Sequence, residues 1–268
     1  MIIDFHTHVF PDKIAKRTIE LLEAKGGVSS FSDGTVDGIL EKLTLAGVDI
    51  AVTLPVLTNP GSFDGVNRFA AEINERFKNE SRRLISFGAI HPACPDIEGK
   101  MKEIKRLGFL GVKIHPDYQE TYINDDGYVK IVNAARELDL VVITHAGVDF
   151  AYPDDVHCPP SLAMELYRKA PHEKLVFAHL GGVKMQKEFL DTFEKTPVYF
   201  DTAYVLRHIN AEILGEWIGR IGDDRILFAS DSPWSDVWRD VEILTSFVKD
   251  ETTKEKLFSL NAKRLLGI

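Results

Sequence analysis

Eight short apolar runs recur along this chain of 268 residues, and helical patterns lie between them. The runs are residues 2–8, 49–55, 84–90, 110–115, 140–145, 174–179, 198–202 and 225–230. The helical segments after the second to eighth runs are residues 63–80, 96–107, 126–138, 160–170, 183–195, 210–221 and 236–249, and two more patterns, between Pro11 and Gly26 and at 37–46, precede the second run. Most runs are continuously apolar rather than alternating, which predicts strands covered on both faces.

Eight strand-then-helix units in about 250 residues match the (β/α)₈ TIM barrel, the α/β architecture that we predict. An open doubly wound sheet is the alternative, but no G-x-G-x-x-G motif follows any of the predicted strands. No linker or shift in composition divides the chain, so we expect one domain over residues 1–268.

Charge and cysteine content restrict the partners that the chain can bind. A formal net charge of −9 offers no broad basic surface to nucleic acid or to an anionic membrane. Two cysteines, Cys94 and Cys158, do not make a disulfide framework. The chain starts on an apolar strand that leaves no room for a signal peptide, and no apolar run approaches the roughly 20 residues of a membrane span. We therefore expect a cytoplasmic protein acting on a small molecule, with a homodimer as one open outcome.

Polar residues gather where the predicted strands end, which is the face that carries chemistry in such barrels. Six of the nine histidines lie at strand ends. The first strand ends in the H-x-H pair His6 and His8, whose rings face one side of the strand because side chains alternate. The later candidates, in chain order, are Lys113 with His115, then His145, His179 and Asp231. Neutral imidazole binds divalent metals, so the set predicts a metal site.

Each of these residues also has a simpler interpretation when it is taken alone. A histidine at a strand end can be hydrogen-bonded to backbone, Asp231 before Ser-Pro can start a turn, and Lys113 can be a lysine whose stem is buried. His115, which precedes a proline, can be loop packing. Chance placement of all these residues at strand ends, in this order, is less plausible than chance placement of any one of them.

The same residues resemble the amidohydrolase superfamily of metal-dependent barrels. Asp4 to Pro11 is similar to the opening of the amidohydrolase-related branch that includes aminocarboxymuconate-semialdehyde decarboxylase, and Leu227 to Trp234 is similar to its closing strand. Gly111 to Pro116 is similar to many hydrolase-like members. The resemblance implies that His6, His8, His145 and Asp231 hold one divalent metal, with zinc expected, and that His179 lies beside the bound water.

The resemblance leaves two reactions open. The first is hydrolysis of a small ester, lactone or amide, with Asp231 as the base and His179 as polariser or proton shuttle. The alternative is non-oxidative decarboxylation of a small unsaturated or aromatic carboxylate, in which His179 takes the larger part. In both, a metal ion lowers the pKa of bound water and polarises a carbonyl.

Three further residues are predicted to contact the cofactor or the substrate. Lys113 and His115 share the fourth strand, and in some superfamily members a carbamylated lysine there bridges two metals, so a binuclear site is an alternative. Arg207 follows the seventh strand and could meet a substrate carboxylate. Two other interpretations are weaker. A related deoxyribonuclease-type barrel usually offers glutamate where Lys113 stands, and a structural metal prefers a closed, cysteine-rich shell.

Overall fold

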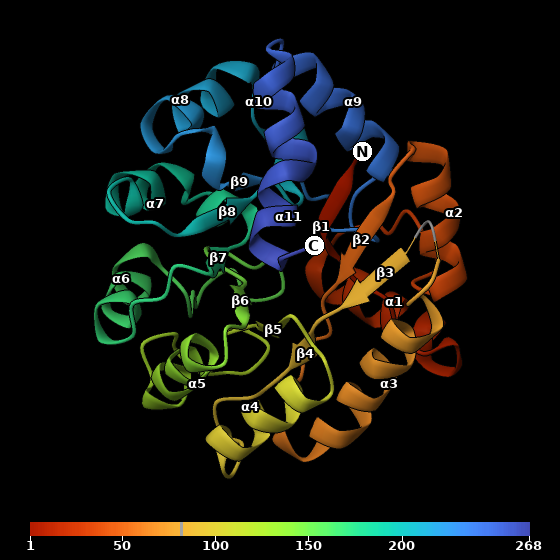
Figure 1. Ribbon diagram of the computed structural model, residues 1–268, viewed down its shortest axis with the longest axis vertical. Coiled ribbons are helices and arrows are strands. Elements are labelled where there is room, and N and C mark those ends of the chain that lie inside the picture. Colours follow the sequence, from red (N-terminus) through yellow and green to blue (C-terminus); the bar gives the residue numbers. More distant parts are fainter. Residues whose placement is uncertain (81–82) are drawn as a thin grey trace.

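The computed structural model describes residues 1–80 and 83–268 and shows a parallel barrel (Figure 1). Its strands are β1 (Ile3–Thr7), β2 (Ile50–Thr53), β3 (Arg83–Ser86), β4 (Gly88–Ala89), β5 (Gly111–Ile114), β6 (Val141–Thr144), β7 (Leu175–Phe177), β8 (Tyr199–Asp201) and β9 (Ile226–Leu227). Every pair of neighbouring strands is parallel, in the orders β1-β2-β3 and β4 to β9. The predicted TIM barrel is confirmed.

The two ends of this strand series are joined by backbone hydrogen bonds. The amide of Phe5 in β1 donates to the Phe228 carbonyl just after β9 at 2.9 Å, and the amide of Asp231 donates to the His6 carbonyl at 2.8 Å. A parallel bridge between Thr7 and Ser232 continues the contact. The first and last predicted strands therefore lie side by side, which brings residues more than two hundred positions apart to one edge.

The predicted third strand, residues 84–90, differs from the structure because it is divided into β3 and β4. Two asparagines of the preceding helix, α3 (Phe63–Arg76), bond to the backbone at the division. Asn74 exchanges two hydrogen bonds with the backbone of Ser86, at 2.7 and 2.9 Å. Asn67 likewise bonds to both the amide and the carbonyl of Ala89. These side chains satisfy groups that a continuous ladder would otherwise pair.

Helices surround the barrel (Figure 1). They are α1 (Asp12–Gly26), α2 (Val36–Ala46), α3, α4 (Ile97–Arg106), α5 (Asp126–Glu137), α6 (Pro160–Lys169), α7 (Gln186–Phe193), α8 (Ala211–Ile221), α9 (Val237–Phe247), α10 (Glu251–Glu255) and α11 (Asn261–Leu266). The two helices predicted before the second strand are α1 and α2. Within residues 1–80 and 83–268, no helix combines the length and the apolar character needed to cross a bilayer.

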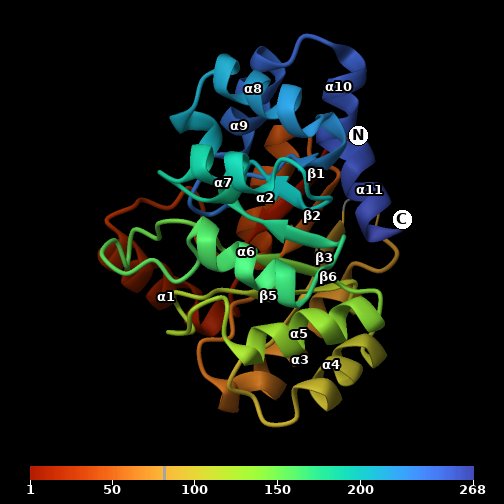
Figure 2. The ribbon, with the colours of Figure 1, turned by 90° about the vertical axis from the view of Figure 1, so that its left-hand side faces the viewer.

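The last helix closes one end of the barrel. Ala262, Leu265 and Leu266 of α11 belong to the same buried cluster as Ile3 of β1 and Val141 of β6, which start their strands. Figure 2 shows α1 at the end opposite α11. The strand ends that carry the polar residues therefore face the side of α1, away from the plug formed by α11.

Candidate functional site

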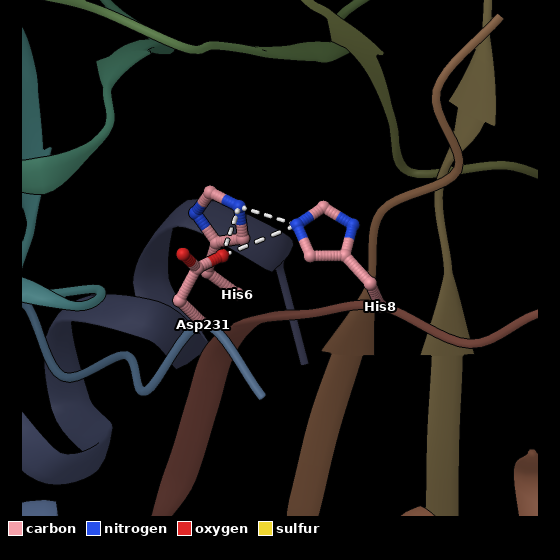
Figure 3. A group of neighbouring side chains, drawn as sticks. All are labelled: His6, His8 and Asp231. Atoms are coloured by element: carbon pink, nitrogen blue, oxygen red, sulfur yellow. Dashed lines mark hydrogen bonds and ion pairs between the residues drawn. The ribbon is translucent and has the colours of Figure 1, made fainter. Parts of the chain in front are cut away.

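His6, His8 and Asp231 converge at the end of β1, as Figure 3 shows. The Nε2 atoms of the two histidines are 3.1 Å apart. The Asp231 Oδ1 atom lies 3.4 Å from Nε2 of His6 and 3.2 Å from Nε2 of His8. Three of the four predicted metal ligands thus form one compact group.

Hydrogen bonds on the far side of each ring fix where its proton lies. The Nδ1 atom of His6 is 2.9 Å from Oδ2 of Asp201, and Nδ1 of His8 is 2.8 Å from the Leu54 carbonyl. The Leu54 carbonyl can only accept, and an ionised Asp201 likewise only accepts at Oδ2, while its Oδ1 accepts from the amides of His179 and Ala203. Each Nδ1 therefore carries the proton, and each Nε2 presents a lone pair to the other.

This group suits a cation. Two lone pairs and one carboxylate oxygen face each other, and the Lys113 amine, 3.2 Å from Nε2 of His6, is a neighbouring proton donor. Burial, followed by the charge of Lys113, holds the pKa of His6 well below its usual value, so a second proton on that ring is disfavoured. Ligands about 2.0–2.1 Å from a tetrahedral ion lie about 3.3 Å from one another, which matches the observed separations. The three residues fit a divalent metal.

His145, the fourth predicted ligand, lies in a neighbouring group. Its Nδ1 is 3.0 Å from Nε2 of His179, whose own Nδ1 donates to the Ala203 carbonyl at 2.9 Å. Its Nε2 faces carboxylate oxygens of Asp117 and Asp149 at 3.7 and 3.8 Å, too far for a hydrogen bond. The role of His145 as a ligand stays a prediction.

One proton on His145 cannot satisfy both sides of its ring. A proton on Nδ1 pairs with His179 but leaves a lone pair facing Asp117 and Asp149; a proton on Nε2 leaves two lone pairs between the rings. His145 is 6% exposed and Asp117 is fully buried, and neither His145 Nε2 nor Asp117 Oδ2 has a hydrogen-bond partner among the described residues. This second group accordingly also has room for a positive charge.

Lys113 links the two groups. Its side chain is 1% exposed, and its Nζ atom is 3.2 Å from Nε2 of His6. Burial lowers the pKa of Lys113 to about 8, although the charges of Asp201, Asp231 and Asp149 oppose that change. The amine is thus closer to its neutral form than an exposed lysine is at neutral pH.

The other two residues predicted to contact cofactor or substrate have different surroundings. The ring of His115 stacks on that of His145, with centroids 4.3 Å apart and planes 8° apart, and its Nε2 lies 3.6 Å from Oδ2 of Asp149. Arg207, in contrast, is not among the described residues that line the cavity of about 750 Å³ above these side chains. Its guanidinium donates to the Trp234 carbonyl and lies 4.3 Å above the Tyr204 ring. Arg207 thus contacts Trp234 and Tyr204, and its contact with a substrate stays a prediction.

The sequence analysis missed three carboxylates that surround these histidines. Asp201 ends β8 and is fully buried against His6, and its place at a strand end was the available signal. Asp117 and Asp149 follow strands β5 and β6 by a few residues, in loops. Their contacts depend on how those loops return over the barrel, which no local pattern reveals. Asp117 is held by the amide and ring of His157 at 3.1 Å each.

The backbone at the strand ends is locally strained. Asp231, His179 and Tyr204 have φ values of 70°, 62° and 65°, in the left-handed region that non-glycine residues seldom adopt. Such conformations concentrate at functional sites. Below them, the buried Asp4 accepts hydrogen bonds from the amides of Ser230 and His6 at 2.9 and 3.2 Å, so it fixes β1 to the last strand without facing the metal position.

A cavity of about 750 Å³ opens above these groups. The candidate side chains form its floor: His6, His8, Lys113, His115, His145, Asp149, His179 and Asp231. Its walls come from α1, from the segment between β2 and α3, from α3 itself and from the loops after β6 to β9. The volume is that of a site for a small organic molecule.

Sequence comparison identifies the family. The model of the amidohydrolase family matches residues 3–268, nearly the whole chain. The chain is an amidohydrolase family member. The resemblance seen in the sequence is thereby confirmed, and the chain is an enzyme of this family.

Solved structures with the same fold cover the whole amidohydrolase chain. A TIM-barrel protein from Bordetella bronchiseptica matches with a TM-score of 0.79 and 17% identity over 99% of this chain and 98% of its own. A manganese-bound dihydroxybenzoic acid decarboxylase from Polaromonas matches with 0.72 and 15% over 99% and 96%. A probable 2-pyrone-4,6-dicarboxylic acid hydrolase from Acinetobacter baumannii matches with 0.68 and 15% over 100% and 99%. At these identities the likeness establishes the fold alone.

Proposed function

We propose that this amidohydrolase is a metal-dependent, non-oxidative decarboxylase of a small carboxylic acid. The observation that carries the proposal is the place of His179, whose ring lies on the cavity floor with its centroid 5.3 Å from that of His6. The names of similar structures support the same reaction, since they include decarboxylases of 2,6-dihydroxybenzoate and 5-carboxyvanillate. Decarboxylation, the alternative at the level of sequence, is therefore favoured over hydrolysis.

The proposed metal ligands are His6, His8 and Asp231, with His145 as the predicted fourth. When bound, a divalent metal supplies positive charge that holds a substrate carboxylate or a neighbouring oxygen. Zinc was expected from the sequence, and manganese is the ion named for two similar structures. Both ions remain proposals for this chain.

Two histidines of the chain, His179 and His145, would transfer one proton to the substrate. In decarboxylation the bond from carbon to the carboxylate breaks, its electron pair stays on the substrate carbon, CO₂ leaves and a proton must reach that carbon. Because Nδ1 of His179 is fixed on the Ala203 carbonyl, Nε2 is the atom that can hold a proton for transfer. The Nδ1 atom of His145 lies 3.0 Å from this Nε2 atom and can replace the transferred proton.

Hydrolysis remains the second candidate because of one specific feature, the buried amine of Lys113 beside His6. A carbamylated lysine there would carry the negative charge that a second cation near His145 and His179 needs. Asp231 would then act as the base for water. The probable pyrone hydrolase among the similar structures is consistent with this alternative.

Metal content and product analysis test these proposals together. We expect the purified protein to bind one equivalent of divalent metal, and the combined change His6→Ala with Asp231→Ala to abolish that binding, while the exposed His208→Ala control retains it. A panel of aromatic and unsaturated acids and of lactones is then assayed for CO₂ and for new carboxylate. Unimpaired turnover in the double variant contradicts the site.

The binuclear alternative has its own measurement. Bound metal that rises toward two equivalents with added bicarbonate, and falls to one in Lys113→Met, supports a bridging carbamate and hydrolysis. A metal content that stays at one equivalent in both the natural chain and Lys113→Met contradicts the binuclear alternative. New carboxylate without CO₂ across the panel would replace the decarboxylase by the hydrolase.

A further inference from the structure

Charge and apolar surface are separated within the cavity. Its ionisable carboxylates and its lysine, namely Asp149, Asp231 and Lys113, all belong to the floor described above. The walls are formed by aliphatic and aromatic side chains with a few hydroxyls, and among the described residues no arginine lines them. A ligand that fills the cavity therefore meets carboxylates and a lysine at one end only.

The first wall is one face of α1. Ile14, Thr18, Leu22 and Gly26 are spaced four residues apart and all line the cavity, while Ile19 of the same helix is buried in the other direction. A spacing of four residues places side chains on one face of a helix. Ile14 is 51% exposed, so an apolar side chain stands open at the mouth.

A second helix contributes a matching face. Ser62, Gly65, Val66 and Phe69, at the start and in the first turns of α3, line the cavity with the same helical spacing. Phe150 and Val183, from the loops after β6 and β7, add further apolar surface. An apolar cavity of about 150 Å³ already holds a benzene ring, so this one, at about 750 Å³, exceeds the needs of a single ring.

The cations nearest to these walls contact wall residues or their neighbours but do not themselves line the cavity. Lys25, just before the end of α1, bonds to the Tyr152 hydroxyl at 2.6 Å and lies 3.8 Å above that ring. Lys184 lies 6.0 Å from the Phe150 ring, and the Arg207 guanidinium is bound to the Trp234 carbonyl. None of the three lines the cavity. A second carboxylate held between these walls would thus have no cationic partner among the described residues that form them.

We propose that the substrate is a monocarboxylic acid whose apolar body is larger than one aromatic ring, with its single acidic group at the histidine-rich floor and the body between α1 and α3. This inference rests on the proposed decarboxylase function, which it sharpens. Polyacidic substrates are excluded by the walls, and single-ring acids leave most of the apolar surface unused.

Binding of three acids to the metal-loaded protein tests the proposal without turnover. We expect 2-naphthoate to bind at least tenfold more tightly than benzoate, since each buried methylene equivalent contributes about fourfold. We expect naphthalene-2,6-dicarboxylate to bind at least tenfold more weakly than 2-naphthoate, because its second carboxylate has no partner. Titration calorimetry measures all three. Equal affinities, or a preference for benzoate or the diacid, overturn the proposal.

Adjacent leucines of α1 provide a matched pair of variants. Leu22 lines the cavity, whereas Leu21 is 59% exposed and does not. Leu22→Arg should improve binding of the diacid at least tenfold and weaken that of 2-naphthoate, while Leu21→Arg should change neither. Thr18→Arg, one turn earlier on the cavity face, replaces Leu22→Arg if that protein does not fold. Identical responses of the wall and control variants contradict the proposed position of the apolar body.

The binding and turnover results separate the two proposals. Selective binding of 2-naphthoate without CO₂ release from any acid keeps the substrate class and refutes the decarboxylase. CO₂ release that is as fast from benzoates or diacids as from extended monoacids keeps the decarboxylase and refutes the substrate class.

Discussion

At the scale of single residues, the contact between Asp201 and His6 controls the proposed metal centre. Asp201 Oδ1 accepts two backbone amides and Oδ2 faces Nδ1 of His6. In Asp201→Asn the oxygen would stay with the amides and the NH₂ group would face His6. The ring would then move its proton to Nε2 and lose the lone pair that the metal needs.

We therefore expect Asp201→Asn to lower metal affinity about 10- to 100-fold, the usual loss when a residue that orients a ligand is changed. Competition with a chromophoric chelator measures the dissociation constant. Asp64→Asn, an exposed change of the same type on α3, is the control. Unchanged affinity in Asp201→Asn would mean that His6 is not a ligand through Nε2.

The sequence predicted which residues gather at the cavity floor better than it predicted their partners. Alternation along β1 was enough to place His6 and His8 on one side, and strand-end positions were enough to select Asp231 and His179. Contacts such as that of Arg207 with the Trp234 carbonyl depend on where two loops meet. From the sequence, an arginine near a strand end is equally compatible with binding a substrate carboxylate and with binding a backbone carbonyl.

At the scale of elements, α3 holds together the divided strand β3–β4. Asn67 is 2% exposed, and its amide bonds to the amide and carbonyl of Ala89 and to the Phe63 carbonyl. Asn67→Ala leaves both groups of Ala89 buried without partners, so we expect a loss of about 2–4 kcal/mol in the free energy of unfolding. Urea denaturation of the metal-free protein measures it.

Asn74 provides a graded comparison for this prediction. It makes the equivalent pair of bonds to Ser86 but is only half-buried, so water can replace it. We expect Asn74→Ala to cost about 1 kcal/mol. Equal losses in the two variants would show that burial of the backbone at the division does not set the cost. The division itself was not predictable, because residues 84–90 are apolar apart from Ser86 and the asparagines that replace the ladder lie on the preceding helix.

At the scale of the whole molecule, eight-fold repetition was enough to predict the barrel, since continuously apolar strands need cover on both faces and the alternation leaves few other topologies. It was also enough to place the site at one mouth. The cavity walls were not predictable, because α1 presents one face to the cavity and another to the barrel. Its pattern does not tell which apolar residues face a ligand.

Buried carboxyls make the stability of the whole chain depend on pH. Asp240 of α9 is 1% exposed, and burial raises its pKa to about 7, against the opposing effects of Ser235 and Arg207. The folded state therefore binds a proton that the unfolded state, with a pKa near 3.8, releases. The stabilisation is complete below about pH 4 and is lost as pH rises to about 7, so unfolding becomes easier over this interval.

Replacing Asp240 by asparagine should remove this dependence. We expect the free energy of unfolding of Asp240→Asn to change less between pH 4 and 8 than that of the natural chain. The two changes should differ by at most about 4 kcal/mol, which corresponds to a shift of roughly three pKa units. Urea titrations with a chelator present at every pH exclude the contribution of metal binding. The surface variant Asp64→Asn should follow the natural chain. If Asp240→Asn keeps the same slope as both, Asp240 is ionised in the folded protein and its buried charge is compensated by Arg207.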